Sequence, residues 1–439
     1  MANPASPIQA QSPSPPTDTM PLLNGQRHAQ DQDQTSQWQP VSGGNRQHVS
    51  LRVSREAWHA LSATIRYSYS NVLLVCVPLG IYAAEHGWSP AAVFTLNFLA
   101  MFPLASILTF STEQLAAEFG SVIGGLINAT FGNAVEMIVG ISALKEGEIS
   151  IVQSSMIGSI LSSILLILGT SFFCVGVGKQ TVDINIDIAG ILTSLMIISC
   201  SSLIIPSALY IANPGSNDSN HNPNDYILNL SRTTSIILLI FYLLYLFFQS
   251  YTHSHLFTEE EEDEQSDKLS TWSSSTVLIL ATVGVAVCSD YLIDSVDGFV
   301  EALGVSRSFI GLIIVPIVGN AGCYVATVKW SRTGKINLAV SVIVGSTLQI
   351  SLFVTPFLVI VGWIIGKDMT LQFDTFETIA LTMSVLIVNC LVRDGQTNYF
   401  EGVLLIGTYV TIAIAFFVHP DSDTAINLAG SIPNITNFA

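Results

Sequence analysis

Charged residues are scarce in this chain of 439 residues: Asp, Glu, Lys and Arg make up 11% of it, whereas 50% is hydrophobic. A large soluble helical protein would need charged helix faces that this sequence lacks. Apolar stretches such as Thr234–Phe248, Thr276–Val287 and Ala380–Val388 are instead spread along the whole chain. A helix needs about 17–25 apolar residues to cross the hydrocarbon layer of a bilayer. The composition therefore predicts an all-α, polytopic membrane protein.

Cysteine is also sparse, and its six copies stand singly in apolar segments without any CxxC pair. This pattern excludes a disulfide framework and a structural zinc site. The sequence contains neither a nucleophile–base set nor a nucleotide-binding loop, so we expect no enzyme, no cofactor and no nucleic acid partner. No secretory signal opens the chain.

Eleven transmembrane spans are predicted from the apolar runs. They cover residues 70–84, 91–109, 119–143, 151–176, 187–210, 233–249, 275–296, 308–330, 337–363, 375–391 and 402–418. Residues 1–66, rich in Gln, Ser, Pro and Asn, are predicted to form a disordered tail. The remainder divides into a first transmembrane half (67–249), an acidic loop (250–273), a second half (274–420) and a C-terminal tail (421–439).

The placement of Lys and Arg sets the expected orientation, because cytosolic loops carry an excess of both. A cytosolic N-terminal tail puts eleven basic residues on the cytosolic side, namely Arg27, Arg46, Arg52, Arg55, Arg66, Lys179, Lys268, Lys329, Arg332, Lys335 and Arg393. The other side then receives four: Lys145, Arg232, Arg307 and Lys367. This orientation places the acidic loop in the cytosol and the C-terminal tail in the lumen.

A polar motif occurs twice in the apolar chain, as Gly-Asn-Ala at residues 132–134 and again at 319–321. At the same offset of 187 residues, further identities follow, which pair Gly147 with Gly334, Ile149 with Ile336, Gly158 with Gly345 and Ser159 with Ser346. These matches predict an internal repeat, about 119–176 and about 308–363. An odd number of crossings separates the copies, so they run in opposite directions through the bilayer, as in many secondary transporters.

Glu136 follows the first motif and places an acid in an apolar segment, where charge is expensive. Gly and Asn permit a local helix break that frees backbone carbonyls, and Asn, Ser and Gln add neutral oxygens. Oxygen ligands suit a hard cation such as Ca²⁺. Burial also disfavours the ionised carboxylate, so protons compete with the metal for Glu136. One carboxyl that holds either a metal ion or a proton is the minimal part of an antiporter.

At this point the residues resemble a known family, the calcium/proton exchangers of fungal and plant vacuoles. The resemblance runs from about residue 67 to residue 420. It is carried by the stretches Tyr69–Leu74, Val93–Asn97, Gly125–Val135, Phe309–Ala321 and Leu352–Val359. It implies a vacuolar membrane protein with two inverted repeats that moves Ca²⁺ out of the cytosol in exchange for protons. Homo-oligomer formation is left open.

The resemblance also implies a set of cation- and proton-binding residues. By position these are Asn133, Glu136, Ser159 and Ser162 in the first repeat, and Asn320, Ser346 and Gln349 in the second. The sequence departs from the family at three places. The second glutamate and the histidine after it are here Cys323 and Tyr324, and an asparagine after the first serines is here Ser163.

Loss of the second acid leaves several functions open. A single carboxylate leaves a net charge of +1 on bound Ca²⁺, which weakens binding in a low-dielectric site. The first hypothesis is a Ca²⁺/H⁺ antiporter with altered affinity or coupling. The second is an antiporter for a softer cation such as Mn²⁺ or Zn²⁺, with Cys323 as a thiolate ligand. The third is a non-transporting regulatory relative. A cation channel is the last alternative.

Other acids near the membrane are weaker candidates, and each fits an interfacial or helix-end charge better than a ligand. They are Glu113, Asp290, Asp294, Asp297, Glu377 and Glu401. Asp290 is the strongest of them for a proton or cation relay, because it follows an unbroken apolar run. We interpret the acidic run of the cytosolic loop as a solvated linker, with attraction of cations or regulation of transport as the alternatives. It consists of Glu259, Glu260, Glu261, Glu262, Asp263 and Glu264.

Overall fold

We describe a computed structural model of the chain over residues 69–212, 223–253 and 270–418. Both tails and the acidic run Glu259–Glu264 lie outside the described residues. Within them the chain is mainly helical, and the only strands form one short antiparallel pair, β1 (Val182–Asp183) with β2 (Gln396–Thr397).

The first half contains seven α-helices and three irregular helical turns. These are η1 (Tyr69–Val75), α2 (Cys76–Glu85), α3 (Pro90–Phe131), α4 (Ala134–Glu146), α5 (Ile149–Leu161), η2 (Ser162–Ile167), α6 (Leu168–Gly176), α7 (Ile186–Ala212), α8 (Pro223–Phe247) and η3 (Phe248–Thr252). The second half contains α10 (Thr271–Asp294), α11 (Val296–Leu303), α12 (Arg307–Phe309), η4 (Ile310–Ile314), α13 (Val315–Gly319), α14 (Ala321–Arg332), α15 (Ile336–Gln349), η5 (Ile350–Val354), α16 (Thr355–Ile365), α17 (Thr375–Val392) and α18 (Tyr399–Val418).

Eight helices of the described part are long and apolar enough to cross a membrane, or nine if the bent pair Val296–Leu303 and Arg307–Gly319 counts as one span. The polytopic all-α class is confirmed, but the number of eleven spans is not. The eight coincide with eight predicted spans. The other three are short or divided, because 70–84 corresponds to an apolar helix over Ser70–Glu85, and 119–143 and 308–330 are broken at the Gly-Asn-Ala motifs.

Helix α3 is bent rather than straight. A Cβ added at Gly124 would collide with the backbone carbonyl of Ala116, eight residues earlier. A straight helix would separate these residues by about 12 Å. The bend therefore falls near the boundary that the sequence placed between its second and third spans.

The two repeats fold alike. The α4–turn–α5 unit ends in the π-helical turn η2, and the α14–turn–α15 unit ends in the π-helical turn η5. The turn glycines at equivalent positions, Gly147 and Gly334, adopt nearly the same left-handed conformation, with φ of 88° and 86°. Glycine adopts positive φ without the steric cost that a Cβ brings. The internal repeat read from the sequence is therefore also a repeat of backbone structure.

Basic residues divide between two faces of the bundle. Lys145, Arg232, Arg307 and Lys367 define what we call the Lys367 face. Arg307 pairs with Glu148 at 3.1 Å, Arg232 pairs with Asp368 at 3.1 Å, and a Cβ on Gly147 would lie 3.4 Å from Lys367 Nζ. These contacts bring together the four basic residues that the sequence assigned to one side.

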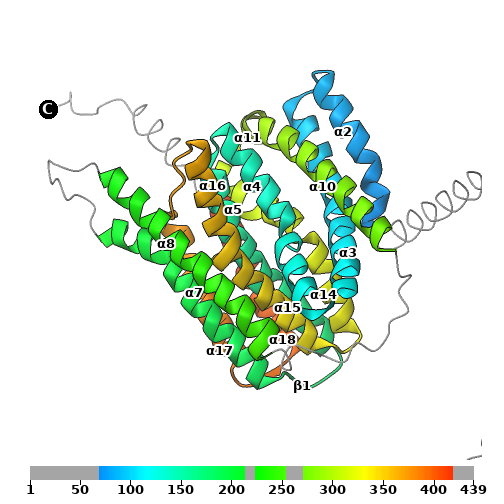
Figure 1. Cartoon of the computed structure of the whole chain (residues 1–439), viewed down its shortest axis with the longest axis vertical. Coiled ribbons are helices and arrows are strands. Elements are labelled where there is room, and N and C mark those ends of the chain that lie inside the picture. Colours follow the sequence, from blue (N-terminus) through cyan, green and yellow to red (C-terminus); the bar gives the residue numbers. More distant parts are fainter. Residues whose placement is uncertain (1–68, 213–222, 254–269, 419–439) are drawn as a thin grey trace, which may run out of the picture. The chain divides into compact units, whose positions relative to one another are not determined.

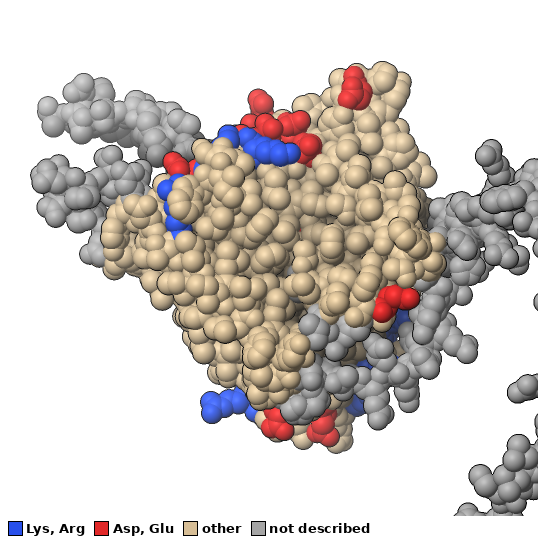
Figure 2. All heavy atoms as spheres, viewed as in Figure 1, with Lys and Arg blue, Asp and Glu red and all other residues tan. Residues whose placement is uncertain are grey.

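The opposite end, which we call the Lys335 face, carries Lys179, Lys335 and Arg393. Here β1 pairs with β2, and the Asn185 backbone N–H donates to Asn337 Oδ1 at 2.8 Å. Helix α5 thus starts at the Lys367 face and α15 at the Lys335 face, which is the inverted arrangement that the repeat predicts. Figure 2 shows the charged side chains gathered mainly at two ends of the visible surface, with a broad uncharged band between them.

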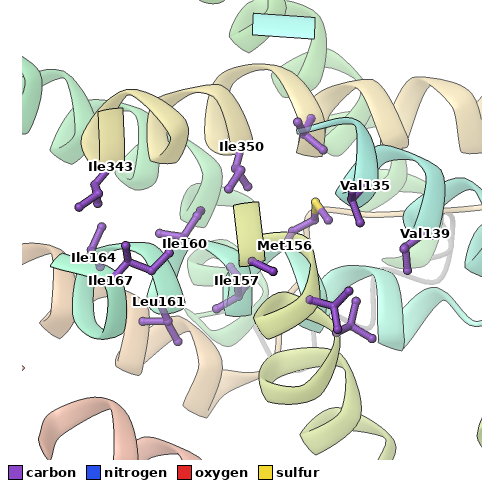
Figure 3. Packing of buried hydrophobic residues seen from close by; sticks show 14 of the residues in the cluster. Val135, Val139, Met156, Ile157, Ile160, Leu161, Ile164, Ile167, Ile343 and Ile350 are labelled. Atoms are coloured by element: carbon purple, nitrogen blue, oxygen red, sulfur yellow. The ribbon is translucent and has the colours of Figure 1, made fainter. Parts of the chain in front are cut away.

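The core lies where the two repeats meet. In Figure 1, α4, α5, α14 and α15 lie between a group formed by α7, α8 and α16 and a group formed by α2, α3 and α10. Ile343 and Ile350 of the second repeat point toward Ile160 and Ile164 of the first (Figure 3), and all four are fully buried. Helix α5 also packs closely on η4, since a Cβ on Gly158 would strike the Leu312 carbonyl. This packing holds in position the helices that flank the two Gly-Asn-Ala motifs.

Candidate cation and proton site

The site is built where each Gly-Asn-Ala motif interrupts its helix. Helix α3 ends at Phe131 and α4 begins at Ala134, whereas α13 ends at Gly319 and α14 begins at Ala321. Asn133 and Asn320 stand in these breaks and are 2% and 3% exposed. Buried amides require hydrogen-bond partners. They find them in the opposite repeat.

Asn133 reaches across to α15 of the second repeat. Its Nδ2 donates to Gln349 Oε1 at 2.6 Å, and its Oδ1 accepts from Ser346 Oγ at 3.2 Å. Three of the predicted site residues are thereby brought together.

Asn320 makes the reciprocal contacts with the first repeat. Its Nδ2 donates to the Ser159 carbonyl at 3.3 Å, and its Oδ1 accepts from Ser163 Oγ at 3.3 Å. Ser163, which stands where the family has asparagine, therefore belongs to the site, although the predicted set did not include it. Ser162 is buried beside it in η2.

Glu136 lies in the first turn of α4 and is 5% exposed. Its Oε1 faces the end of α13, because a Cβ added to Gly319 would lie 2.8 Å from that oxygen. Its Oε2 is buried and accepts no hydrogen bond from the described residues. A buried polar atom left without a partner costs free energy unless a ligand or a proton satisfies it. The first acid of the site is therefore open to a cation or a proton.

Cys323 occupies the place equivalent to Glu136 in the second repeat. It is partly buried, and the carboxyls of Glu136 and Glu113 both interact with it electrostatically. The next residue, Tyr324, is exposed. Of the two residues that depart from the family here, Cys323 therefore lies near Glu136.

No three His, Cys, Asp or Glu side chains gather into a metal-binding group anywhere in the described ranges. Among the predicted ligands of this site, Glu136 supplies the carboxylate and the others supply amide, hydroxyl and backbone oxygens. Such a donor set suits a hard cation such as Ca²⁺.

The weaker acidic candidates lie elsewhere. Asp290 is exposed on α10 and accepts from Ser142 Oγ of α4 at 2.5 Å, while Asp294 is exposed one turn farther on. Asp297 pairs with Arg307 at 2.6 Å, and Glu401 bonds to Thr397 and Asn398 at the start of α18.

Glu377 and Glu113 differ from these acids. Glu377 lies in the first turn of α17, as expected of a helix-end charge, but it is 2% exposed and accepts a hydrogen bond from Ser154 Oγ. Its spacing after Asp374 is a capping signal that sequence reasoning could have recognised, whereas its burial was not visible there. Glu113 is partly buried in α3.

A family profile described as "Sodium/calcium exchanger protein" matches residues 89–251 and 273–418, which together exceed half of the chain. The chain belongs to this family. Among the similar exchanger family members is a "Vacuolar calcium ion transporter" of Schizosaccharomyces pombe, 44% identical over 80% of this chain and 85% of that protein. A "Ca(2+)/H(+) antiporter" of Synechocystis is 38% identical over 80% of this chain and 97% of that protein.

A solved structure of the same fold supports this assignment. The structure of native YfkE has a TM-score of 0.69 and 34% identity over 80% of this chain and 100% of that one. The helical membrane fold of the exchanger family is thereby confirmed for this chain.

Proposed function

We propose that this chain is a secondary active antiporter that moves Ca²⁺ from the cytosol into a vacuole in exchange for protons. The names of its vacuolar and Ca²⁺/H⁺ exchanging relatives support this proposal. The observation that carries it is Glu136, a buried carboxyl with one unpartnered oxygen, close to polar groups contributed by both repeats.

Exchange follows from the cost of burying a charge. An ionised Glu136 without a partner is unfavourable in this environment, so the carboxyl must hold either a cation or a proton. The amide, hydroxyl and carbonyl oxygens of both Gly-Asn-Ala breaks supply the remaining ligands. Because the donors come from opposed repeats, a relative movement of the repeats would open the site to one side and then to the other.

The orientation is part of the proposal. The Lys335 face is cytosolic and the Lys367 face is lumenal, which follows from the excess of basic residues assigned to the side of the N-terminal tail. The N-terminus is then cytosolic, and the protein lies in the vacuolar membrane.

A flux assay with the full chain tests the transport proposal. In proteoliposomes with an acidic interior we expect ⁴⁵Ca²⁺ uptake that a protonophore abolishes. Glu136→Gln preserves shape but removes the charge, and it should lower uptake at least about ten-fold, as expected for loss of a buried charged ligand. Glu401→Gln, the same change at a partly exposed helix start, serves as the control. Normal uptake by the Glu136 variant would refute the proposal.

Cys323 supports a second candidate, an antiporter for a softer cation. The same vesicles should then take up Zn²⁺ or Mn²⁺ in preference to Ca²⁺, and Cys323→Ser should abolish that uptake. Uptake of Ca²⁺ that is insensitive to Cys323→Ser contradicts this candidate.

A non-transporting regulatory protein is the remaining alternative. It requires that the wild-type chain transports none of the three cations Ca²⁺, Zn²⁺ and Mn²⁺. Flux that appears only in the double variant Cys323→Glu, Tyr324→His would then assign the inactivity to the altered second repeat.

A further inference from the structure

The bundle contains a second buried carboxyl, outside the site described above. Glu377 in the first turn of α17 accepts a hydrogen bond from Ser154 Oγ of α5. No lysine or arginine of the described part forms an ion pair with it. Asp374, which is exposed, is the titratable group that interacts electrostatically with Glu377, and the α5 group that bonds to Glu377 is the Ser154 hydroxyl. A buried carboxyl without a neutralising cation disfavours its ionised form.

Helix capping explains part of this arrangement but does not require an acid. Asp374 caps α17 by accepting from the Phe376 backbone N–H at 2.8 Å, and the Glu377 carboxyl accepts in turn from the Asp374 backbone N–H. This is a capping box, in which glutamine serves as well as glutamate. The choice of an ionisable residue at a buried position therefore needs a reason other than the cap.

Glu377 lies between the Lys367 face and the ion site. Helix α5 starts at that face with Ile149, and Gln153 Nε2 donates to the Thr370 carbonyl at 2.8 Å in the segment that follows Lys367. Ser154 is the next residue. Ser159 of the ion site is five residues farther along the same helix, about 7.5 Å along its axis.

A continuous series of contacts joins the two carboxyls. A Cβ on Gly311 of η4 would lie 2.9 Å from Ser154 Cβ, so α5 and η4 touch directly at the residue that holds Glu377. The chain continues from η4 into α13, and α13 ends at Gly319, which faces Glu136 Oε1. A shift of α5 on protonation of Glu377 would therefore reach the backbone beside Glu136.

We propose that Glu377 is a second proton-binding carboxyl of this exchanger, accessible from the Lys367 face, and that it supplies the proton capacity lost where Cys323 replaces an acid. This inference rests on the proposed antiport. The carboxylate takes up a proton as O–H and releases it when the cation site fills. A serine hydroxyl can donate to the carboxylate or accept from the acid, so Ser154 serves both states.

Proton release on Ca²⁺ binding tests this inference with the solubilised full chain. Protons released per Ca²⁺ bound are compared for the wild type, Glu377→Gln and Glu401→Gln. Glu401 is a matched control, because it occupies the same position after Asn398 as Glu377 does after Asp374. We expect Glu377→Gln to bind Ca²⁺ but to release about half as many protons, since one of two coupled carboxyls is gone. Unchanged release overturns the inference.

Infrared difference spectroscopy tests the role of Glu377 independently of whether the antiport proposal is correct. If the wild type binds no Ca²⁺, the antiport proposal fails, and the carbonyl band of a titrating carboxylic acid still reports on Glu377. Glu136 and Glu377 both contribute to that band, so both contributions should persist in Glu401→Gln, whereas Glu377→Gln should remove one of them and leave that of Glu136. Ser154→Ala, which keeps the acid, should shift its frequency and provides a second measurement if Glu377→Gln does not fold. A band unaffected by these changes overturns the inference.

Discussion

At the scale of single residues, the candidate site depends on how closely two backbones approach. Gly319 has no side chain where Glu136 Oε1 lies, and the carboxyl occupies the space that a Cβ would fill. The same residue ends α13 and so lies at a helix break. A glycine is therefore required here for close approach rather than for its backbone conformation.

Gly319→Ala should displace the Glu136 carboxyl while leaving the fold intact. The added Cβ would lie 2.8 Å from Oε1, which is too close, and the end of the glutamate side chain can move away. Binding constellations tolerate displacements of about 0.5 Å, so we expect Ca²⁺ affinity to fall at least about ten-fold in an equilibrium ⁴⁵Ca²⁺ binding assay.

Gly407→Ala provides the control for this change, because nothing lies within 4 Å of a Cβ at that position. It should bind Ca²⁺ as the wild type does. Equal affinity in the Gly319 and Gly407 variants would mean that Glu136 does not bind the cation.

Several polar residues that the sequence singled out contact one another in the structure, but the sequence did not indicate which residues they would contact. Asn133, Ser346 and Gln349 meet as a set, and so do Asn320 and Ser159. The sequence contained no sign that Ser163 would bond Asn320 or that Ser154 would bond Glu377, because both contacts join segments more than 150 residues apart. A hydroxyl in an apolar helix can also bond its own backbone, and only packing decides between these outcomes.

At the scale of elements, the equivalent turns between paired helices show that the repeat is structural. Gly147 and Gly334 each lie in the turn that follows a helix, in the left-handed region, and let the next helix return alongside the last. In both repeats the helix that carries the Gly-Asn-Ala motif is broken at the motif. This break explains why the predicted spans 119–143 and 308–330 are not continuous helices.

Gly334→Ala should destabilise the protein through its backbone alone. Nothing lies within 4 Å of a Cβ at Gly334, but φ there is 86°. A left-handed conformation costs a non-glycine residue roughly 1–2 kcal/mol. We expect a lower midpoint of thermal unfolding in detergent, and a similar decrease for Gly147→Ala.

Gly190→Ala is the matched control, since this helical glycine also has open space around it and no positive φ. Alanine is the better helix former, so its unfolding midpoint should not fall. If Gly334→Ala were as stable as this control, the turn would not be held in the left-handed conformation.

At the scale of the whole molecule, the distribution of charge defines two faces and an uncharged band between them (Figure 2). The basic residues that sequence counting assigned to one side do meet at the Lys367 face. The division into faces is therefore a property of the fold, while the identity of the cytosolic face remains a proposal.

Cysteine labelling of intact vacuoles tests that orientation. Lys335→Cys should react with a membrane-impermeant maleimide added outside, above the labelling of the wild type. Lys367→Cys should react only after the membrane is permeabilised. The reverse pattern would invert the proposed topology.

The sequence by itself determined the membrane class, the inverted repeat and the position of Glu136, because hydropathy, repeated motifs and a lone acid in an apolar segment are local features of the chain. Only the tertiary structure decided which polar groups of the two repeats contact one another, that the spans are broken at the motifs, and that Glu377 is buried rather than at an interface. The physical reason is that burial and hydrogen bonding between distant segments depend on how helices pack, and a pattern along one segment does not specify the segment opposite.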